Sequence, residues 1–164
     1  MKSLNSTQTL ASMLIARDWK IALAESCTGG LVCATLTDLA GSSAWFERGY
    51  ITYSNEAKTD CLGVPAELIE SFGAVSEQVA NAMASGALKA SGANVAISIT
   101  GIAGPSGGST AKPVGTVCFG WAIQSSATDS RLICKTMHFD GDRGSIREQA
   151  KDYALVELIA LLRN

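Results

Sequence analysis

Apolar residues recur along the first third of the chain in one helical stripe and two short runs. Residues 10–15 have apolar positions at helical spacing, and the apolar run 21–24 that follows predicts a buried strand. β-Branched and aromatic residues at 49–54 predict a second strand that leads into a short helix reaching Lys58. The chain is therefore expected to open with a helix and then to alternate strands with helices.

The middle of the chain predicts two helices, a strand and a long loop. Pro65 favours the start of a short helix, and Ser76 is expected to cap a longer helix that runs to about Ala90. The run 94–100 is a strong strand, and 101–113 is too rich in glycine and proline for regular structure. A loop of this length inside a compact domain is usually functional.

The last third predicts a hairpin and one long helix. Segments 115–123 and 131–139 have the pattern of two antiparallel strands, and Ser145 and Glu148 have the spacing of a capping box. The apolar stripe of the helix comprises Ile146, Ala150, Tyr153, Ala154, Leu158, Leu161 and Leu162. Together the elements predict an α/β fold: a single-domain αβα sandwich over residues 1–164, with a mixed central sheet covered on both faces.

Composition narrows the classes of protein that this chain could represent. Hydrophobic residues make up 47% of the 164 residues and charged residues only 17%, which excludes intrinsic disorder. So low a charged fraction favours a homo-oligomer, most simply a dimer, with apolar residues near 44–46 as part of the covered surface. The net charge is −2 and no basic run is present, which argues against a nucleic-acid partner and favours a small-molecule site.

Targeting and metal-binding patterns are missing from the sequence. The polar start of the chain does not resemble a signal peptide, and no apolar stretch is long enough for a membrane span, so we expect a cytoplasmic protein without a membrane partner. The five cysteines include no C-x-x-C pair, and His138 is the only histidine. We therefore expect neither a metal nor another cofactor, and any catalysis must use other residues.

The turn between the first strand and the next helix is the strongest candidate site. Ser26 follows the strand, so it could be a nucleophile, and the backbone of Thr28, Gly29 and Gly30 could bind an oxyanion or a phosphate. Glu25 is either a substrate-binding residue or a carboxylate at the end of a strand. In the alternative interpretation, Ser26 or Thr28 is only the N-cap of the helix.

A serine nucleophile needs a base, and a single histidine leaves lysine as the better candidate. If the first two strands end at the same edge of the sheet, Lys58 can reach Ser26, and burial would lower its pKa toward that of a useful base. The alternative is an ordinary solvated lysine. Cys27 is intrinsically more nucleophilic than serine, but a small thiol beside the turn is expected to point into the core.

Two further segments could bind an anion. Thr100 and Gly101 begin a glycine-rich loop that resembles a phosphate-binding loop in composition, although it matches no nucleoside-triphosphatase motif. Arg143 is expected just before the last helix, where its guanidinium and free N–H groups could hold an anion. The alternative there is a capped, solvated turn.

Six blocks of sequence, in the same order, resemble one known family. They are AESCTGG (24–30), AGSSAWF (40–46), YSNEAK (53–58), GAVSE (73–77), TGIAGP (100–105) and KPVGTV (112–117). Over nearly its full length the chain is similar to the C-terminal domain family of competence-damage-inducible protein A, and in particular to its stand-alone members, the nicotinamide-nucleotide amidohydrolases. Cys118 departs from the family pattern, which often has tryptophan there, and this change bears on the shape of the substrate pocket.

The resemblance implies removal of ammonia from nicotinamide mononucleotide to give nicotinate mononucleotide, with a serine nucleophile, a lysine base and no metal. Carried to this sequence, the nucleophile would be Ser26 and the base Lys58, with Tyr53 and Thr100 around the lysine and the ring. Other interpretations are a non-catalytic nucleotide-binding module, in which Ser26 is only a cap, and an inactive paralogue.

Overall fold

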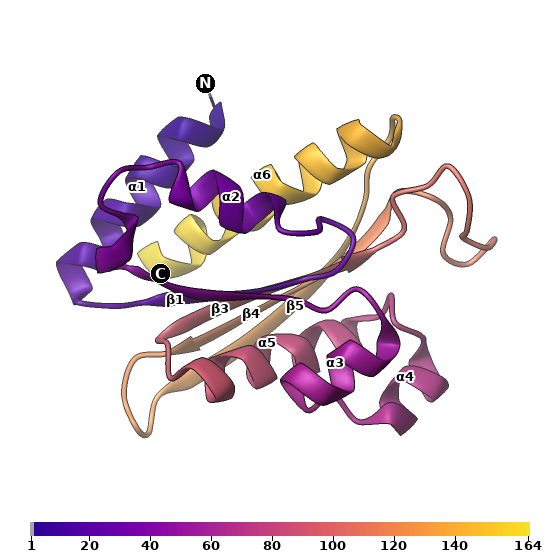
Figure 1. The fold of residues 1–164 in the computed structure, drawn as a ribbon, viewed down its shortest axis with the longest axis horizontal. Helices are drawn as coiled ribbons and strands as arrows, with labels where there is room; N and C mark the ends of the chain where they lie inside the picture. Colours follow the sequence, from indigo (N-terminus) through magenta and orange to yellow (C-terminus); the bar gives the residue numbers. More distant parts are fainter. Residues whose placement is uncertain (1) are drawn as a thin grey trace.

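The computed structural model of the protein describes residues 2–164, which form one sheet with helices on both faces (Figure 1). The strands are β1 (Ile21–Glu25), β2 (Phe46–Ile51), β3 (Val95–Gly101), β4 (Thr116–Gln124) and β5 (Ser130–His138). The helices are α1 (Lys2–Arg17), α2 (Leu31–Thr37), α3 (Asn55–Leu62), α4 (Ala66–Phe72), α5 (Glu77–Ser91) and α6 (Arg143–Arg163), with a 3₁₀ turn at Ser42–Ala44. The predicted αβα sandwich is confirmed.

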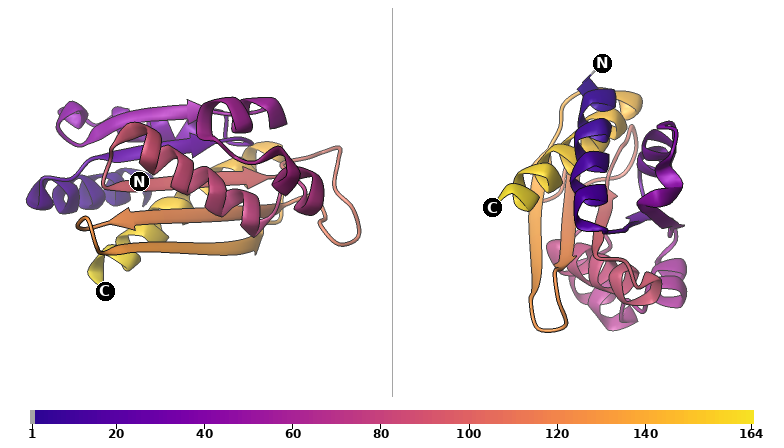
Figure 2. Two further views of the ribbon diagram at one scale, coloured as in Figure 1. Left: turned by 90° about the horizontal axis from the view of Figure 1, so that it is seen from below. Right: turned by 90° about the vertical axis from the view of Figure 1, so that its left-hand side faces the viewer.

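The five strands lie in the order β2-β1-β3-β4-β5, so the sheet is mixed. β1 pairs in parallel with β2 and β3, whereas β4 and β5 continue the sheet as antiparallel strands. Helices α1, α2 and α6 cover one face, and α3, α4 and α5 cover the other (Figures 1 and 2). The chain leaves β1 toward β2 on one side and returns to β3 on the other, so the carboxyl end of β1 is a switch point, where α/β sheets commonly bind ligands.

The larger core lies between the sheet and the face formed by α1, α2 and α6. The Phe119 and Trp121 rings stack within it at 5.6 Å between centroids. Trp45 also lies in this core and is 1% exposed, so the expectation that the apolar residues near 44–46 belong to a subunit interface is wrong for this side chain. The large indole is instead used to fill the space beside the sheet.

The long C-terminal helix starts earlier than the capping-box pattern predicts. Asp142 is the N-cap, and its Oδ1 accepts a hydrogen bond from the Ser145 N–H at 2.8 Å. Arg143 is consequently the first residue of α6 and does not precede the helix. The physical reason is that the Asp142 side chain already satisfies the free N–H that Ser145 contributes, as N-cap carboxylates commonly do.

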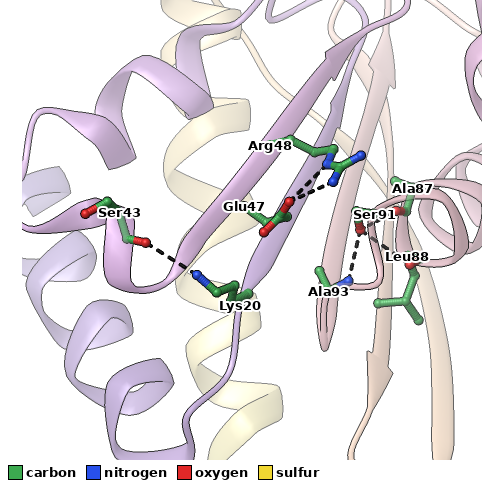
Figure 3. Close-up of polar contacts among 8 residues, drawn as sticks. All are labelled: Lys20, Ser43, Glu47, Arg48, Ala87, Leu88, Ser91 and Ala93. Atoms are coloured by element: carbon green, nitrogen blue, oxygen red, sulfur yellow. Dashed lines mark hydrogen bonds and ion pairs between the residues drawn. The ribbon is translucent and has the colours of Figure 1, made fainter.

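Polar contacts fix the turns at the sheet end that is remote from the predicted site (Figure 3). Lys20 donates to the Ser43 carbonyl at 3.4 Å, and the Ser91 hydroxyl donates to the Ala87 carbonyl at 2.6 Å while accepting from the Ala93 N–H at 3.1 Å. The Glu47–Arg48 pair lies on the edge strand β2, where charges discourage pairing with another sheet.

Within residues 2–164, none of the helices has the length and apolar character that a membrane crossing requires.

Gly86 of α5 allows the end of α3 to pack closely against it. A Cβ at position 86 would lie 2.0 Å from the Leu62 carbonyl oxygen, which is rigid backbone. We expect Gly86→Ala to lower the free energy of unfolding by about 1–3 kcal/mol, because the two helices must separate. Thermal and denaturant unfolding would measure the loss.

Gly144→Ala is the matched control for this prediction. Position 144 lies in the first turn of α6. A Cβ added there would lie 3.6 Å from Oδ1 of Asp142, which is ordinary van der Waals contact. Alanine there should leave stability unchanged or raise it by up to about 1 kcal/mol. Equal losses in the two variants would contradict the close approach of α3 and α5.

Candidate active site

A pocket of about 280 Å³ opens where the chain leaves β1 and β3. Its walls come from the turn after β1, from α3, from the long loop after β3 and from the start of α6. Seven residues discussed in the sequence analysis line it: Ser26, Cys27, Tyr53, Lys58, Thr100, Gly101 and Arg143. The fold therefore brings together side chains that lie up to 117 positions apart in the chain.

Ser26 lies at the first position beyond β1 and is 8% exposed. Its N–H donates to the Ile99 carbonyl at 3.0 Å, so the residue is still tied to β3. The chain then turns sharply through Gly29 and Gly30, whose φ values of +57° and +100° favour glycine. The turn thus presents the Ser26 hydroxyl at the end of the sheet.

Glu25 supports this turn from beneath and does not line the pocket. Its buried carboxylate accepts hydrogen bonds from the N–H groups of Gly30, Val32 and Cys33 at 3.2, 3.0 and 2.9 Å. These are free donors at the start of α2, so a carboxylate five residues upstream satisfies the helix. The structure thus favours a supporting role for Glu25 over the predicted contact with substrate.

The alternative in which Ser26 or Thr28 is only a helix cap is wrong. The N-cap of α2 is Gly30, which has no side chain to cap the helix. Thr28 is fully buried, and within residues 2–164 its hydroxyl has no hydrogen-bond partner. The Ser26 hydroxyl is therefore available for another purpose.

The backbone donors predicted to bind an oxyanion are partly engaged elsewhere. The Gly29 N–H donates to the Ser26 carbonyl at 3.0 Å, and the Gly30 N–H donates to Glu25. These bonds disagree with an oxyanion-binding role for the Gly29 and Gly30 N–H groups. Within the described chain, the N–H groups of Cys27 and Thr28 are the two in this turn to which no acceptor is assigned.

Lys58 reaches the pocket from the first turns of α3. Ser54 caps that helix, its Oγ accepting from the Ala57 N–H at 3.0 Å, and the lysine side chain runs inward so that the residue is 1% exposed. The Nζ lies 3.0 Å from the Ser26 Oγ. It also donates to the Thr52 carbonyl at 2.7 Å and to the Tyr53 carbonyl at 3.3 Å.

Burial lowers the pKa of Lys58 from its ordinary value, because the ammonium form loses its hydration. A neutral amine carries two N–H donors and one lone pair. In the ammonium form the three N–H groups match the three acceptors, with Ser26 Oγ as the third. In the neutral form, which burial favours, the carbonyls of Thr52 and Tyr53 take the two donors and the lone pair faces the Ser26 hydroxyl. The geometry is that of a serine beside a base that can accept its proton.

Cys27 has the properties of a core thiol. The residue is 7% exposed, and burial raises the pKa of its thiol to about 11. Since the thiolate is the nucleophilic form, this thiol is almost entirely unreactive near neutral pH. The choice of Ser26 over Cys27 as the candidate nucleophile therefore has a physical basis.

Arg143 and Tyr53 meet at the mouth of the pocket. Arg143 donates to the Gly104 carbonyl at 2.7 Å and to the Tyr53 hydroxyl at 3.1 Å. The phenol of Tyr53 is thus turned toward the arginine, and only its backbone carbonyl contacts Lys58. Thr100 donates to the Ala74 carbonyl at 2.8 Å and fixes the opposite wall.

Arg147 is a functional candidate that the sequence interpretation missed. Its side chain donates to the carbonyls of Cys27 and Thr28 at 3.1 and 3.0 Å, directly behind Ser26. The available signal is helical spacing, since position 147 follows Arg143 by about one turn and shares its helix face. The distance of 120 residues from the turn hides this contact in the sequence.

The family model that matches this chain is the CinA C-terminal domain, and it covers residues 4–162. The chain belongs to this family. A protein named nicotinamide-nucleotide amidohydrolase PncC from Escherichia coli K12 is 52% identical over 152 residues, which are 93% of this chain and 90% of that protein. A protein of the same name from Enterobacter agglomerans is 52% identical over 146 residues, or 89% of this chain and 87% of the relative.

Solved structures of this family share the fold. The crystal structure of competence damage-inducible protein A from Klebsiella pneumoniae has a TM-score of 0.93 at 39% identity and covers 99% of this chain and 98% of its own. A competence/damage-inducible protein from Agrobacterium tumefaciens has a TM-score of 0.93 at 41% identity, with coverages of 100% and 97%. The sandwich described above is therefore the family fold.

The lowered pKa of Lys58 predicts how the reactivity of Ser26 depends on pH. A fluorophosphonate probe should phosphonylate Ser26 faster as pH rises through the pKa of Lys58, with an inflection below the value of about 10.4 for a free lysine. Lys58→Met should slow labelling by about 10²–10⁴-fold and abolish this pH dependence. Mass spectrometry of the labelled peptide gives the rate. An inflection at or above the free-lysine value would contradict a buried base.

Proposed function

We propose that this protein hydrolyses the carboxamide of nicotinamide mononucleotide to give nicotinate mononucleotide and ammonia. The observation that carries the proposal is the 3.0 Å contact between the buried Lys58 amine and the Ser26 hydroxyl inside the pocket. A serine activated by a neutral amine suits attack on a carboxamide carbon. The names of the relatives, which cover nearly the whole chain, support this choice of substrate.

In the first half of the proposed reaction, the Ser26 oxygen bonds to the carboxamide carbon while its proton passes to Lys58. The negative charge of the tetrahedral intermediate then needs N–H donors, and those of Cys27 and Thr28 are the uncommitted ones in the turn. The Lys58 ammonium returns the proton to the nitrogen of the substrate. The carbon–nitrogen bond breaks, ammonia leaves, and Ser26 holds the acyl group as an ester.

In the second half, water attacks the ester carbon and gives its proton to the again neutral Lys58. The ester bond breaks, the Ser26 oxygen takes the proton back, and the pyridine carboxylate is released. The net change is one amide and one water converted to one carboxylic acid and one ammonia. No step requires a metal ion or an organic cofactor.

Recognition of the 5′-phosphate is assigned in this proposal to Arg143. Its guanidinium lies at the mouth of the pocket and at the first position of α6, where it could bind a phosphate oxygen through a charge-assisted hydrogen bond. The competing location is the loop 101–108, whose backbone could hold a phosphate without an arginine. Both locations border the same pocket.

The proposed setting is the recycling of pyridine nucleotides in the cytoplasm. We also propose a homo-oligomeric form, with the dimer as the simplest case, because the chain has only 17% charged residues. Half-exposed apolar side chains such as Ile51, Leu132 and Val156 are consistent with a partly covered surface.

Ser26 and Lys58 should behave as one unit. We expect Ser26→Ala and Lys58→Met each to lower turnover of nicotinamide mononucleotide by several orders of magnitude, and the double variant to lose little more. Release of ammonia by the purified proteins measures this. A wild-type protein that binds the nucleotide but releases no ammonia would instead be a nucleotide-binding module, and near-normal turnover of Ser26→Ala would refute the nucleophile.

Arg143→Ala should weaken the mononucleotide selectively. A charge-assisted hydrogen bond contributes about 1.5–3 kcal/mol, so the KM for the mononucleotide should rise roughly 10- to 150-fold while the phosphate-free riboside changes little. Tyr53→Phe is the matched control, since it removes the hydroxyl that Arg143 contacts and leaves the guanidinium in place. An equal loss for both substrates would show that Arg143 supports the loop at Gly104 and not the phosphate.

A further inference from the structure

The half-buried Arg147 connects the last helix to the turn that carries the candidate nucleophile. Its Nε and Nη2 donate to two consecutive carbonyls, those of Cys27 and Thr28. The two carbonyls belong to the Cys27–Thr28 and Thr28–Gly29 peptide groups, just beyond Ser26 in the chain. Arg147 is not among the residues that line the pocket, so it acts on the turn and not on a ligand there.

Peptide planarity extends the effect of these two bonds. In a trans peptide the C=O and the following N–H point in opposite directions, so fixing the Cys27 carbonyl also fixes the Thr28 N–H. Fixing the Thr28 carbonyl likewise orients the Gly29 N–H, which donates to the Ser26 carbonyl on the other side. The Thr28 carbonyl also accepts from the Leu31 N–H at 3.0 Å, so two backbone bonds already hold the peptide plane after Thr28. The plane after Cys27, which carries the uncommitted Thr28 N–H, therefore depends most on the guanidinium.

Glu25 holds the same turn from the opposite end. Its carboxylate accepts from the N–H groups of Gly30, Val32 and Cys33, whereas Arg147 donates to carbonyls nearer Ser26. The Glu25 carboxylate thus binds backbone N–H groups of this segment, and the Arg147 guanidinium binds its backbone carbonyls. The turn after Ser26 is therefore held by charged side chains at both ends, in addition to its own backbone hydrogen bonds.

We propose that Arg147 is a positioning residue for Ser26, which holds the peptide groups after the nucleophile in the orientation needed for attack and for stabilisation of the oxyanion. The inference rests on the proposed function of Ser26. A planar guanidinium is needed because two adjacent carbonyls must be bound from one rigid group, which a single ammonium cannot reproduce. The role concerns the transition state more than substrate binding.

The first test is the kinetics of Arg147→Ala with nicotinamide mononucleotide. We expect kcat to fall by about 10²-fold, the cost of a small misplacement of reacting groups, and KM to change less than about 3-fold. Arg147→Lys should recover part of kcat through one donor. Millimolar guanidinium ion should raise the activity of Arg147→Ala and not that of the wild type.

Arg131→Ala is the matched control. Arg131 likewise donates to a backbone carbonyl, that of Leu161 at 2.9 Å, but it pairs in register with Ile123 at the far end of the sheet. This variant loses an arginine–carbonyl bond without touching the turn. Its kcat should stay within about 2-fold of the wild type, since surface contacts of this kind contribute little.

Labelling of Ser26 by a fluorophosphonate separates this inference from the proposed function. Failure of the wild type to release ammonia would refute the proposed substrate, while slower labelling in Arg147→Ala would still support the positioning role. Unchanged kcat and unchanged labelling in Arg147→Ala would overturn it. If Arg147→Ala has a lowered melting temperature, Arg147→Lys is measured under conditions where it is fully folded. A wild-type kcat and labelling rate in Arg147→Lys would contradict the need for a guanidinium. A reduced kcat and labelling rate with a constant KM would support it.

Discussion

The site depends on the buried amine of Lys58, whose neutral form has one backbone acceptor for each of its two N–H groups. Lys58 lies inside the protein at 1% exposure, where the charged form is disfavoured, and two backbone carbonyls account for the donors of the neutral form. Those carbonyls follow β2, so the strand order that sets β2 beside β1 also sets the lysine beside Ser26. The helix α3 must approach α5 closely for this, and Gly86 provides the space. Sheet topology, helix packing and protonation state are thus linked through a single side chain.

Several parts of this arrangement could be predicted from sequence because their causes are local. The apolar run 21–24 followed by a polar turn predicted a strand with Ser26 at its end, and the spacing after the second strand brought Lys58 to the same edge. Ser76 caps α5 as expected because a serine before a helical stripe satisfies free N–H groups of that helix. The stacked aromatic residues of β4 are core, as their alternation on a strand implies.

Other parts have long-range causes and could not be read from the pattern. Glu25 was assigned to the pocket, but its carboxylate turns back to the start of α2, which depends on the three-dimensional path of the turn. The helix begins three residues before the capping-box pattern predicts, because the Asp142 carboxylate accepts the Ser145 N–H and makes Arg143 to Ser145 its first turn. The low charged fraction predicts an interface near Trp45, but the local sequence does not show that the indole packs into the core beside the sheet.

The contact between α6 and the turn after β1 also has a consequence for the order in which the molecule is completed. Ser26 and Lys58 are made early in synthesis, but the guanidinium that fixes the carbonyls of Cys27 and Thr28 is 120 and 119 positions further along the chain. Contacts of such separation form late, because the loop between them must first be closed. A nascent or truncated chain that lacks α6 would therefore hold Ser26 next to a loosely ordered turn. Maturation of the site is in this way coupled to the synthesis and docking of α6.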